Sequence, residues 1–369
     1  MELSDNAGKE ESALKVNEGI PQPAAISPNA LERFKQKQQP LLSADEFARG
    51  ILMGNRVILS KAITLIESVN PAHNSLAQEV IEQCLPYSGK SVRIGITGVP
   101  GVGKSTFIEA LGKHVTALGH KLAVLAIDPS SSRTKGSILG DKTRMEELST
   151  DENAFIRPSP SAGSLGGVAR KTKESIILCE AAGFDVIFVE TVGVGQSEIA
   201  VHSMVDFFLL LMLAGAGDEL QGIKRGIMEM ADAIFINKAD GDNRQKASQA
   251  KMEYKNALHL FPPPESGWTP VTGLCSALSK EGIPEVWEVI GKYQVLTKEN
   301  GYFDQKRLQQ KSLIMIETIK ETLRNDFYST EKIRQLLPLV ETDMLNDKIS
   351  SYVAAQKLIQ VYFDEKKAI

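Results

Sequence analysis

The sequence contains few of the residues that build metal clusters or disulfide frameworks. Only three of its 369 residues are cysteine, and each lies among apolar neighbours: Cys84, Cys179 and Cys275. Its five histidines form no His-Glu-x-x-His or paired spacing. We therefore expect no zinc site and interpret the cysteines as reduced core thiols of a reducing compartment. No Ser-His-Asp arrangement of a serine hydrolase is visible either.

Long apolar runs and a strong excess of one charge are missing as well. The longest apolar run, Phe207 to Gly217, is far short of the ~20 residues that a membrane helix needs. The formal net charge of −4 gives no reason to expect a nucleic-acid or membrane binder. The first residues include Glu2, Asp5 and Glu10 without an apolar stretch. We therefore expect neither a secretory signal nor a transit peptide, and a cytoplasmic protein.

What is present is the composition of a globular protein, with 42% hydrophobic and 24% charged residues. Residues 1–27 are polar, and we expect a disordered tail there. Residues 28–89 have the apolar spacing of helices and include a capping box at Ser43-Ala-Asp-Glu46. We expect an N-terminal helical segment there, which either supports the next domain or docks a partner.

From residue 90 to residue 294 the chain alternates strand and helix patterns. This alternation predicts an α/β domain with a mostly parallel sheet and helices on both faces. Helical spacing returns over 295–369, where the helices either pack back on the core or form a dimer surface. The strand candidates are 92–97, 122–127, 186–190, 206–213, 233–236 and 270–275.

The most informative stretch joins the first predicted strand to the helix after it. Gly98-Val-Pro-Gly-Val-Gly-Lys104-Ser105 has the Gly-x4-Gly-Lys-Ser spacing of a phosphate-binding loop. Its glycines let main-chain N–H groups close around phosphates. We expect Lys104 to reach the β- and γ-phosphates and the Ser105 hydroxyl to hold Mg²⁺. The predicted phosphate-binding residues are Gly98, Val99, Pro100, Gly101, Val102, Gly103, Lys104, Ser105 and Thr106.

A second motif selects the base. Asn237-Lys238-Ala-Asp240 follows a predicted strand and fits the Asn-Lys-x-Asp guanine signature. The Asp240 carboxylate accepts two hydrogen bonds from guanine, and adenine lacks that pair of donors. The Lys238 stem can cover the base face. Ser276-Ala277-Leu278, after the last predicted strand, matches the loop whose backbone N–H contacts the guanine oxygen.

Candidate groups for hydrolysis and for Mg²⁺ follow other strands. Glu190 ends a predicted strand and could act on the Mg²⁺ shell, and the Gly193 N–H could sense the γ-phosphate. Gln196 stands two residues beyond the position at which small GTPases carry a water-orienting glutamine. We therefore expect slow hydrolysis unless a rearranged loop or a partner supplies a group. Asp128 follows a strand and is a candidate Mg²⁺ ligand, with an Asx turn as the alternative. Asp141 is a weaker candidate for the same task.

Together these segments resemble the MeaB/ArgK family of P-loop GTPases, relatives of the human methylmalonic aciduria type A protein. The resemblance covers about residues 40–295 and includes stretches that generic GTPases lack. The matching segments are GITGVPGVGKST at 95–106, DPSSSRTKGSILGDKTRM at 128–145, FIRPSPSAGSLGGVARKTKE at 155–174, FDVIFVETVGVGQSE at 184–198, AGAGDELQGIKRGIMEMAD at 214–232 and NKAD at 237–240.

The resemblance implies a homodimeric GTPase that acts as a chaperone of adenosylcobalamin-dependent methylmalonyl-CoA mutase, gating cofactor loading and protecting or reactivating the mutase. Its three switch segments correspond to 128–145, 190–198 and 214–225. Asp218 and Lys224 in the third segment gain weight as residues that couple to the partner. GTP and GDP are then substrate and product, with Mg²⁺ as cofactor and residues 295–369 as the dimerisation segment.

Two other functions stay open at this point. An older family name implies a nucleotide-dependent kinase or ATPase of an arginine/ornithine (LAO/AO) transport system, although Asp240 argues against ATP. A metallochaperone role would follow from more distant relatives, but the sequence has no His/Cys cluster for it.

Overall fold

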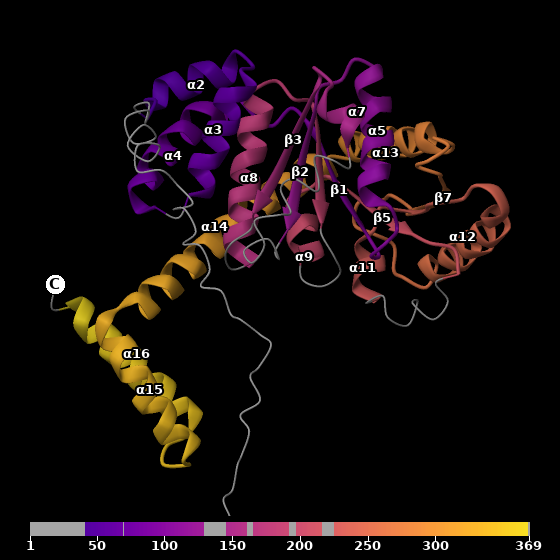
Figure 1. Cartoon of the computed structure of the whole chain (residues 1–369). Coiled ribbons are helices and arrows are strands. Elements are labelled where there is room, and N and C mark those ends of the chain that lie inside the picture. The colour runs from indigo at the N-terminus through magenta and orange to yellow at the C-terminus, as the bar shows by residue number, and fades with distance from the viewer. Residues whose placement is uncertain are drawn as a thin grey trace, which may run out of the picture. The chain divides into compact units, whose positions relative to one another are not determined.

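The computed structural model describes residues 41–68, 70–128, 145–160, 165–191, 197–215 and 225–367 (Figure 1). The described residues from Ser43 onward form one compact unit around a sheet of seven parallel strands, in the order β3-β2-β4-β1-β5-β6-β7. The strands are β1 (Val92–Gly98), β2 (Leu122–Asp128), β3 (Ala154–Pro160), β4 (Val186–Thr191), β5 (Phe207–Met212), β6 (Ala233–Ile236) and β7 (Val271–Leu274).

Six of these strands were predicted from the sequence, and the expected α/β fold is confirmed. Every residue of β1, β4, β5 and β6 is buried, as expected for strands covered on both faces. The seventh strand, β3, was not predicted, because Pro158 and Pro160 cannot donate to a ladder. They are tolerated because β3 is the edge strand beside β2.

Helices cover both faces of the sheet (Figure 1). Among them, α5 and α13 pack against each other, and so do α8 and α9. α13 runs across position 294, where the sequence analysis places the end of the nucleotide domain. That domain division stays a prediction. These helices are α5 (Lys104–Ala117), α7 (Glu146–Ser149), α8 (Leu165–Ala181), α9 (Ser197–His202), α11 (Arg225–Met230), α12 (Arg244–Leu258) and α13 (Ile283–Glu299), with 3-10 turns at Leu85–Tyr87 and Gly241–Asn243.

The N-terminal helical segment consists of α2 (Ala44–Leu52), α3 (Arg56–Glu67) and α4 (Pro71–Cys84). The predicted capping box is confirmed: the Glu46 N–H donates to Ser43 Oγ at 3.3 Å, and the Glu46 carboxylate accepts from the Ser43 N–H at 2.8 Å. All three helices contact α8, so this segment is joined to the sheet through one of its covering helices.

The C-terminal helices are α14 (Tyr302–Ser329), α15 (Glu331–Leu345) and α16 (Ser351–Lys367). α15 and α16 share a small apolar core formed by Ile333, Val340, Ala354 and Leu358, against which Phe327 of α14 packs. None of the described helices combines the length and the apolar character that a bilayer span needs.

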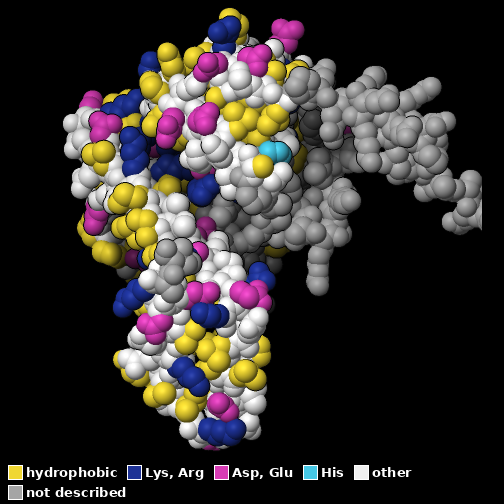
Figure 2. All heavy atoms as spheres, turned by 90° about the vertical axis from the view of Figure 1, so that its left-hand side faces the viewer, with side chains coloured by type: hydrophobic (Ala, Val, Ile, Leu, Met, Phe, Trp, Pro, Cys, Tyr) yellow, Lys and Arg dark blue, Asp and Glu magenta, His cyan; other side chains and the backbone are white. Residues whose placement is uncertain are grey.

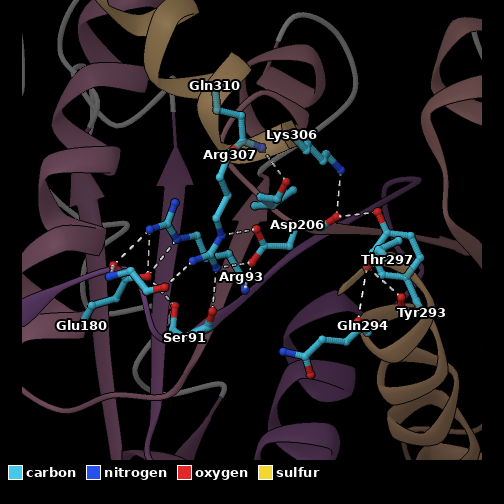
Figure 3. A network of polar contacts seen from close by, with 12 residues as sticks. Ser91, Arg93, Glu180, Asp206, Tyr293, Gln294, Thr297, Lys306, Arg307 and Gln310 are labelled. Atoms are coloured by element: carbon cyan, nitrogen blue, oxygen red, sulfur yellow. Dashed lines mark hydrogen bonds and ion pairs between the residues drawn. The ribbon is translucent and has the colours of Figure 1, made fainter. Parts of the chain in front are cut away.

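A buried polar network ties α14 to the sheet at the end opposite the phosphate loop (Figure 3). The Asp206 carboxylate, just before β5, accepts from the Arg93 N–H at 2.8 Å and from Arg307 of α14 at 2.7 and 2.8 Å. The Arg93 side chain pairs with Glu180 at the end of α8. The Asp206 carbonyl accepts from Lys306 at 2.7 Å. One carboxylate therefore orders β1, β5 and α14 together.

A buried lysine of α8 lies next to this network. The Lys173 ammonium is buried and has no hydrogen-bond partner among the described residues. Burial, together with the positive charges of Arg93, Lys311 and Arg307, lowers the pKa of Lys173 to about 7. Near neutral pH a large fraction of this side chain is therefore uncharged in the folded protein.

The substitution Lys173→Met is expected to change how stability depends on pH. An unfolded lysine stays protonated to about pH 10, so the native state binds fewer protons than the unfolded state between pH 7 and that value. The free energy of unfolding of the unmodified chain should therefore rise relative to that of Lys173→Met by about 2 kcal/mol from pH 7 to pH 9. Urea unfolding at the two pH values measures this difference. Lys320→Met, at an exposed site of α14, is the control, and a difference that is constant with pH would contradict a buried neutral lysine.

Candidate nucleotide-binding site

The predicted phosphate loop connects the carboxyl end of β1 to the first turn of α5. Gly101 and Gly103 have φ angles of +76° and +89°, in the left-handed region that favours glycine. A Cβ at Gly98 would lie 2.5 Å from the Leu211 carbonyl oxygen of β5. The glycines at these positions thus permit both the turn of the loop and its close approach to the neighbouring strand.

Lys104 lies over this loop. Its ammonium donates to the Gly98 carbonyl at 2.8 Å. Burial lowers the pKa of Lys104, and the negative charges of Glu190 and Glu198 oppose that effect. The ammonium is therefore held where the loop turns, and two carboxylates favour its charged form.

The Asn237 side chain joins three loops. Its Nδ2 donates to the Val102 carbonyl of the phosphate loop at 2.8 Å, and its Oδ1 accepts from the Ala277 N–H at 3.0 Å. Asn237 follows β6, Val102 follows β1 and Ala277 follows β7. A single buried carboxamide thus fixes the phosphate loop relative to the loop predicted to contact the guanine oxygen.

The neighbours of Asn237 complete the base site. Lys238, with φ +57°, donates from its ammonium to the Gly101 carbonyl at 2.8 Å. The Ser276 hydroxyl hydrogen-bonds the Asp240 carboxylate. The same hydroxyl oxygen accepts from the Ser279 N–H at 3.1 Å. Asp240 is therefore oriented by Ser276, a role that the sequence analysis did not predict. Leu278 is 83% exposed and marks the outer rim.

The structure describes part of the side of the site where the sequence analysis predicts Mg²⁺ binding and catalysis. Glu190 is buried on β4, opposite Ile96 of β1 in the ladder. Thr191 donates to the Thr97 hydroxyl at 2.8 Å, which ties the end of β4 to the end of β1. Ser105 is half-buried in the first turn of α5. These residues stand at the carboxyl ends of adjacent parallel strands, where ligands of such sheets bind.

Glu198 was missed by the sequence analysis as a functional candidate. It lies in α9, is fully buried and acts electrostatically on Lys104. The signal that could have found it is its place at the end of the matching segment 184–198.

Six predicted residues cannot be placed in full. Asp128 ends β2, but its side chain lies outside the described part of the structure. The other five lie outside it entirely: Asp141, Gly193, Gln196, Asp218 and Lys224. Among the described residues no group of three or more His, Cys, Asp or Glu could hold a metal ion. The Ser105 hydroxyl and the Glu190 carboxylate nevertheless have the oxygen chemistry that Mg²⁺ prefers when phosphates supply other ligands.

The fold and this arrangement define a P-loop nucleotide-binding protein with a guanine-type base site. Comparison with known proteins makes the assignment specific. The family model described as "Methylmalonyl Co-A mutase-associated GTPase MeaB" matches residues 59–332. The chain belongs to this family of GTPases, as its motifs predicted, and is an enzyme that hydrolyses GTP.

Several relatives match along most of their length. A "Putative GTPase" of Caulobacter vibrioides is 46% identical over 88% of this chain and 99% of its own. "GTPase ArgK" of Escherichia coli is 44% identical over 86% and 98%. The "Methylmalonic aciduria type A homolog, mitochondrial" of Mus musculus is 45% identical over 90% and 82%. A solved "LAO/AO transport system kinase" has a TM-score of 0.71 and 37% identity, covering 87% of this chain and 99% of that one.

The substitution Asn237→Ala is expected to weaken GDP binding by about ten- to a hundredfold. It leaves the buried Val102 carbonyl and Ala277 N–H unpaired, at about 1–3 kcal/mol for each buried group. Titration calorimetry with Mg²⁺ and GDP measures the loss. Asn346→Ala, at the end of α15, removes an exposed asparagine and should leave GDP affinity unchanged. Equal affinity of both variants would mean that the carboxamide bridge does not organise the site.

Proposed function

We propose that this GTPase is a chaperone of an adenosylcobalamin-dependent methylmalonyl-CoA mutase and that GTP hydrolysis gates the loading of the mutase with its cofactor. The matching family is named for its association with methylmalonyl-CoA mutase, and the mouse relative is named for methylmalonic aciduria. The observation that carries the nucleotide part is the Asn237 bridge between the phosphate loop and the base loop. Protection and reactivation of the mutase belong to the same proposal.

The reaction we propose is attack of water on the γ-phosphorus of GTP, with cleavage of the bond to the β-phosphate bridging oxygen to give GDP and phosphate. Main-chain N–H groups of the loop from Gly98 to Thr106 hold the phosphates, and Lys104 neutralises charge that develops on the leaving oxygens. Ser105, Glu190, Asp128 and Asp141 are the candidates to hold Mg²⁺. The ion, when bound, would shield the β- and γ-phosphate oxygens.

Partner coupling is assigned to segments 128–145, 190–198 and 214–225. Gln196 and Lys224 are the proposed catalytic contributors from them, and the Gly193 N–H is the proposed γ-phosphate sensor. Segments ordered by a triphosphate and released with a diphosphate are the usual output of such enzymes. The buried pair Glu190 and Glu198 beside Lys104 supports the second segment as a part of this response.

A second candidate function comes from the solved LAO/AO transport system kinase, which covers 87% of this chain. In that case the γ-phosphoryl group passes to a hydroxyl, imidazole or carboxylate of an acceptor protein. GTP labelled in the γ-position separates the two functions. Release of free phosphate, stimulated by purified mutase, supports the chaperone. Label on an acceptor protein supports the kinase and would contradict our proposal.

The substitution Asp240→Asn is expected to shift base preference from guanine to xanthine. The carboxylate accepts from the guanine N1–H and amino group, whereas an amide can donate to the xanthine 2-oxygen. Turnover with GTP should fall by at least tenfold relative to turnover with xanthosine triphosphate, measured as phosphate release under matched conditions. Asp242→Asn, in the adjoining turn, serves as the control with unchanged preference. Retained preference of Asp240→Asn for GTP would remove Asp240 from the base site.

The homodimer that we propose uses the C-terminal helices. α14 exposes an apolar row of Ile316, Ile319 and Leu323, at 41%, 50% and 59%. Figure 2 shows hydrophobic side chains among charges at the bottom of the view, the level at which Figure 1 draws α15 and α16. Light scattering should give a dimer for the unmodified chain and a monomer for Ile319→Asp/Leu323→Asp. Glu317→Gln, also on exposed α14, should stay dimeric. A dimer that survives the double substitution would place the interface elsewhere.

A further inference from the structure

A hollow separate from the nucleotide site lies between α3 and the edge strand β3. Its volume is about 580 Å³, within the range of about 300–1,000 Å³ typical of small-molecule sites. α3 belongs to the N-terminal helical segment, whereas β3 is the edge of the nucleotide-binding sheet. The two walls of the hollow thus come from parts of the chain that are about 100 residues apart in sequence, as Arg56 and Ala154 illustrate.

Three cationic side chains line this hollow: Arg56, Lys61 and Arg157. Arg157 pairs with Glu67. Arg56 donates to main-chain oxygens of Asp151 and Ala154. In the described part of the chain neither Arg56 nor Lys61 has a carboxylate within ion-pair distance, so the walls carry an excess of positive charge.

The hollow also has hydrogen-bond donors without an acceptor among the described residues. The Arg157 Nε is buried and lacks an acceptor among the described residues, although Nη1 of the same group donates to Ser60 Oγ at 3.4 Å. Because Ser60 accepts there, its hydroxyl proton remains to donate. A buried donor without an acceptor calls for a ligand, an ion or a water, and with cations on both walls that partner should be an anion.

The edge of β3 favours a small ligand over an added strand. The Leu122 N–H of β2 donates to the Asn153 carbonyl at 2.8 Å, so the main chain of Ala154 and, two residues on, Ile156 faces away from β2. Arg56 already donates a hydrogen bond to the Ala154 carbonyl, and Pro158 has no N–H. Among Ala154, Ile156 and Pro158, an incoming strand would therefore find one free N–H, that of Ile156, which is too little for a ladder.

Each wall also carries apolar side chains. Val57 is 65% exposed beside the cations, and Ile156 and Pro158 line the opposite side. We propose that the hollow between α3 and β3 binds a small phosphate-bearing anion that has an apolar part, with Arg56 and Lys61 on the phosphate and Val57, Ile156 and Pro158 against the apolar part. Arginine and lysine together with hydroxyl donors are the groups that recognise phosphate in proteins.

Phenyl phosphate is a suitable probe because it joins a dianion to an apolar ring. The full-length chain is first saturated with Mg²⁺ and a non-hydrolysable GTP analogue, so that the phosphate loop is occupied. Calorimetric titration should then give one equivalent of phenyl phosphate bound, with weaker binding of inorganic phosphate. Lys61→Glu should weaken phenyl phosphate at least tenfold, and Arg56→Ala should do the same. Lys246→Glu, an exposed lysine of α12, should leave the affinity unchanged.

Lys61 makes no hydrogen bond or ion pair with any residue that the structure describes, so the charge reversal there should not unfold the chain. Unchanged binding of the GTP analogue verifies this. The same control separates this proposal from the proposed function. The chain can bind the GTP analogue without binding phenyl phosphate, and it can bind phenyl phosphate without acting on a mutase. No binding of phenyl phosphate to the loaded chain would overturn the proposal, as would equal binding by Lys61→Glu and Lys246→Glu. Equal affinity for inorganic phosphate would overturn its apolar part.

Discussion

The whole nucleotide site depends on one buried carboxamide. Asn237 is 1% exposed and holds the Val102 carbonyl and the Ala277 N–H at the same time. The phosphate loop, the loop after β6 and the loop after β7 are each irregular, and without a shared partner each could relax independently. Both bonds are buried, so water cannot replace them when the side chain is removed. Loss of the carboxamide would then leave the Val102 carbonyl and the Ala277 N–H unpaired, and this cost holds the three loops in one arrangement.

The opposite end of the sheet has its own organising group. Asp206 joins the start of β5 to the main chain of β1 and to Arg307 of α14. β1 continues into the phosphate loop and β5 into the segment 214–225. Two neighbouring strands, one of which leads into the phosphate loop, are therefore anchored at their amino ends to a C-terminal helix. This network links the strands of the sheet to α14, one of the helices in the proposed dimer surface.

Much of this could be predicted from sequence, for identifiable reasons. Continuous apolar runs predicted six strands, and the Gly-x4-Gly-Lys-Ser and Asn-Lys-x-Asp spacings predicted the residues that the structure brings together at the carboxyl ends of β1 and β6. β3 escaped prediction because its two prolines contradict strand propensity, and only its edge position makes them acceptable. The Ser276–Asp240 contact, the burial of Glu198 and the Asp206 network arise from tertiary packing between segments far apart in sequence, and no local pattern encodes them.

The central claim is that main-chain amides, Lys104 and the Asn237–Asp240 pair form one guanine nucleotide site. Titration calorimetry of the purified full-length chain with Mg²⁺ and GDP tests it most directly. The account predicts one-to-one binding of GDP and no measurable binding of ADP at the same concentrations. Absence of heat with GDP, or equal affinity for ADP, would contradict it.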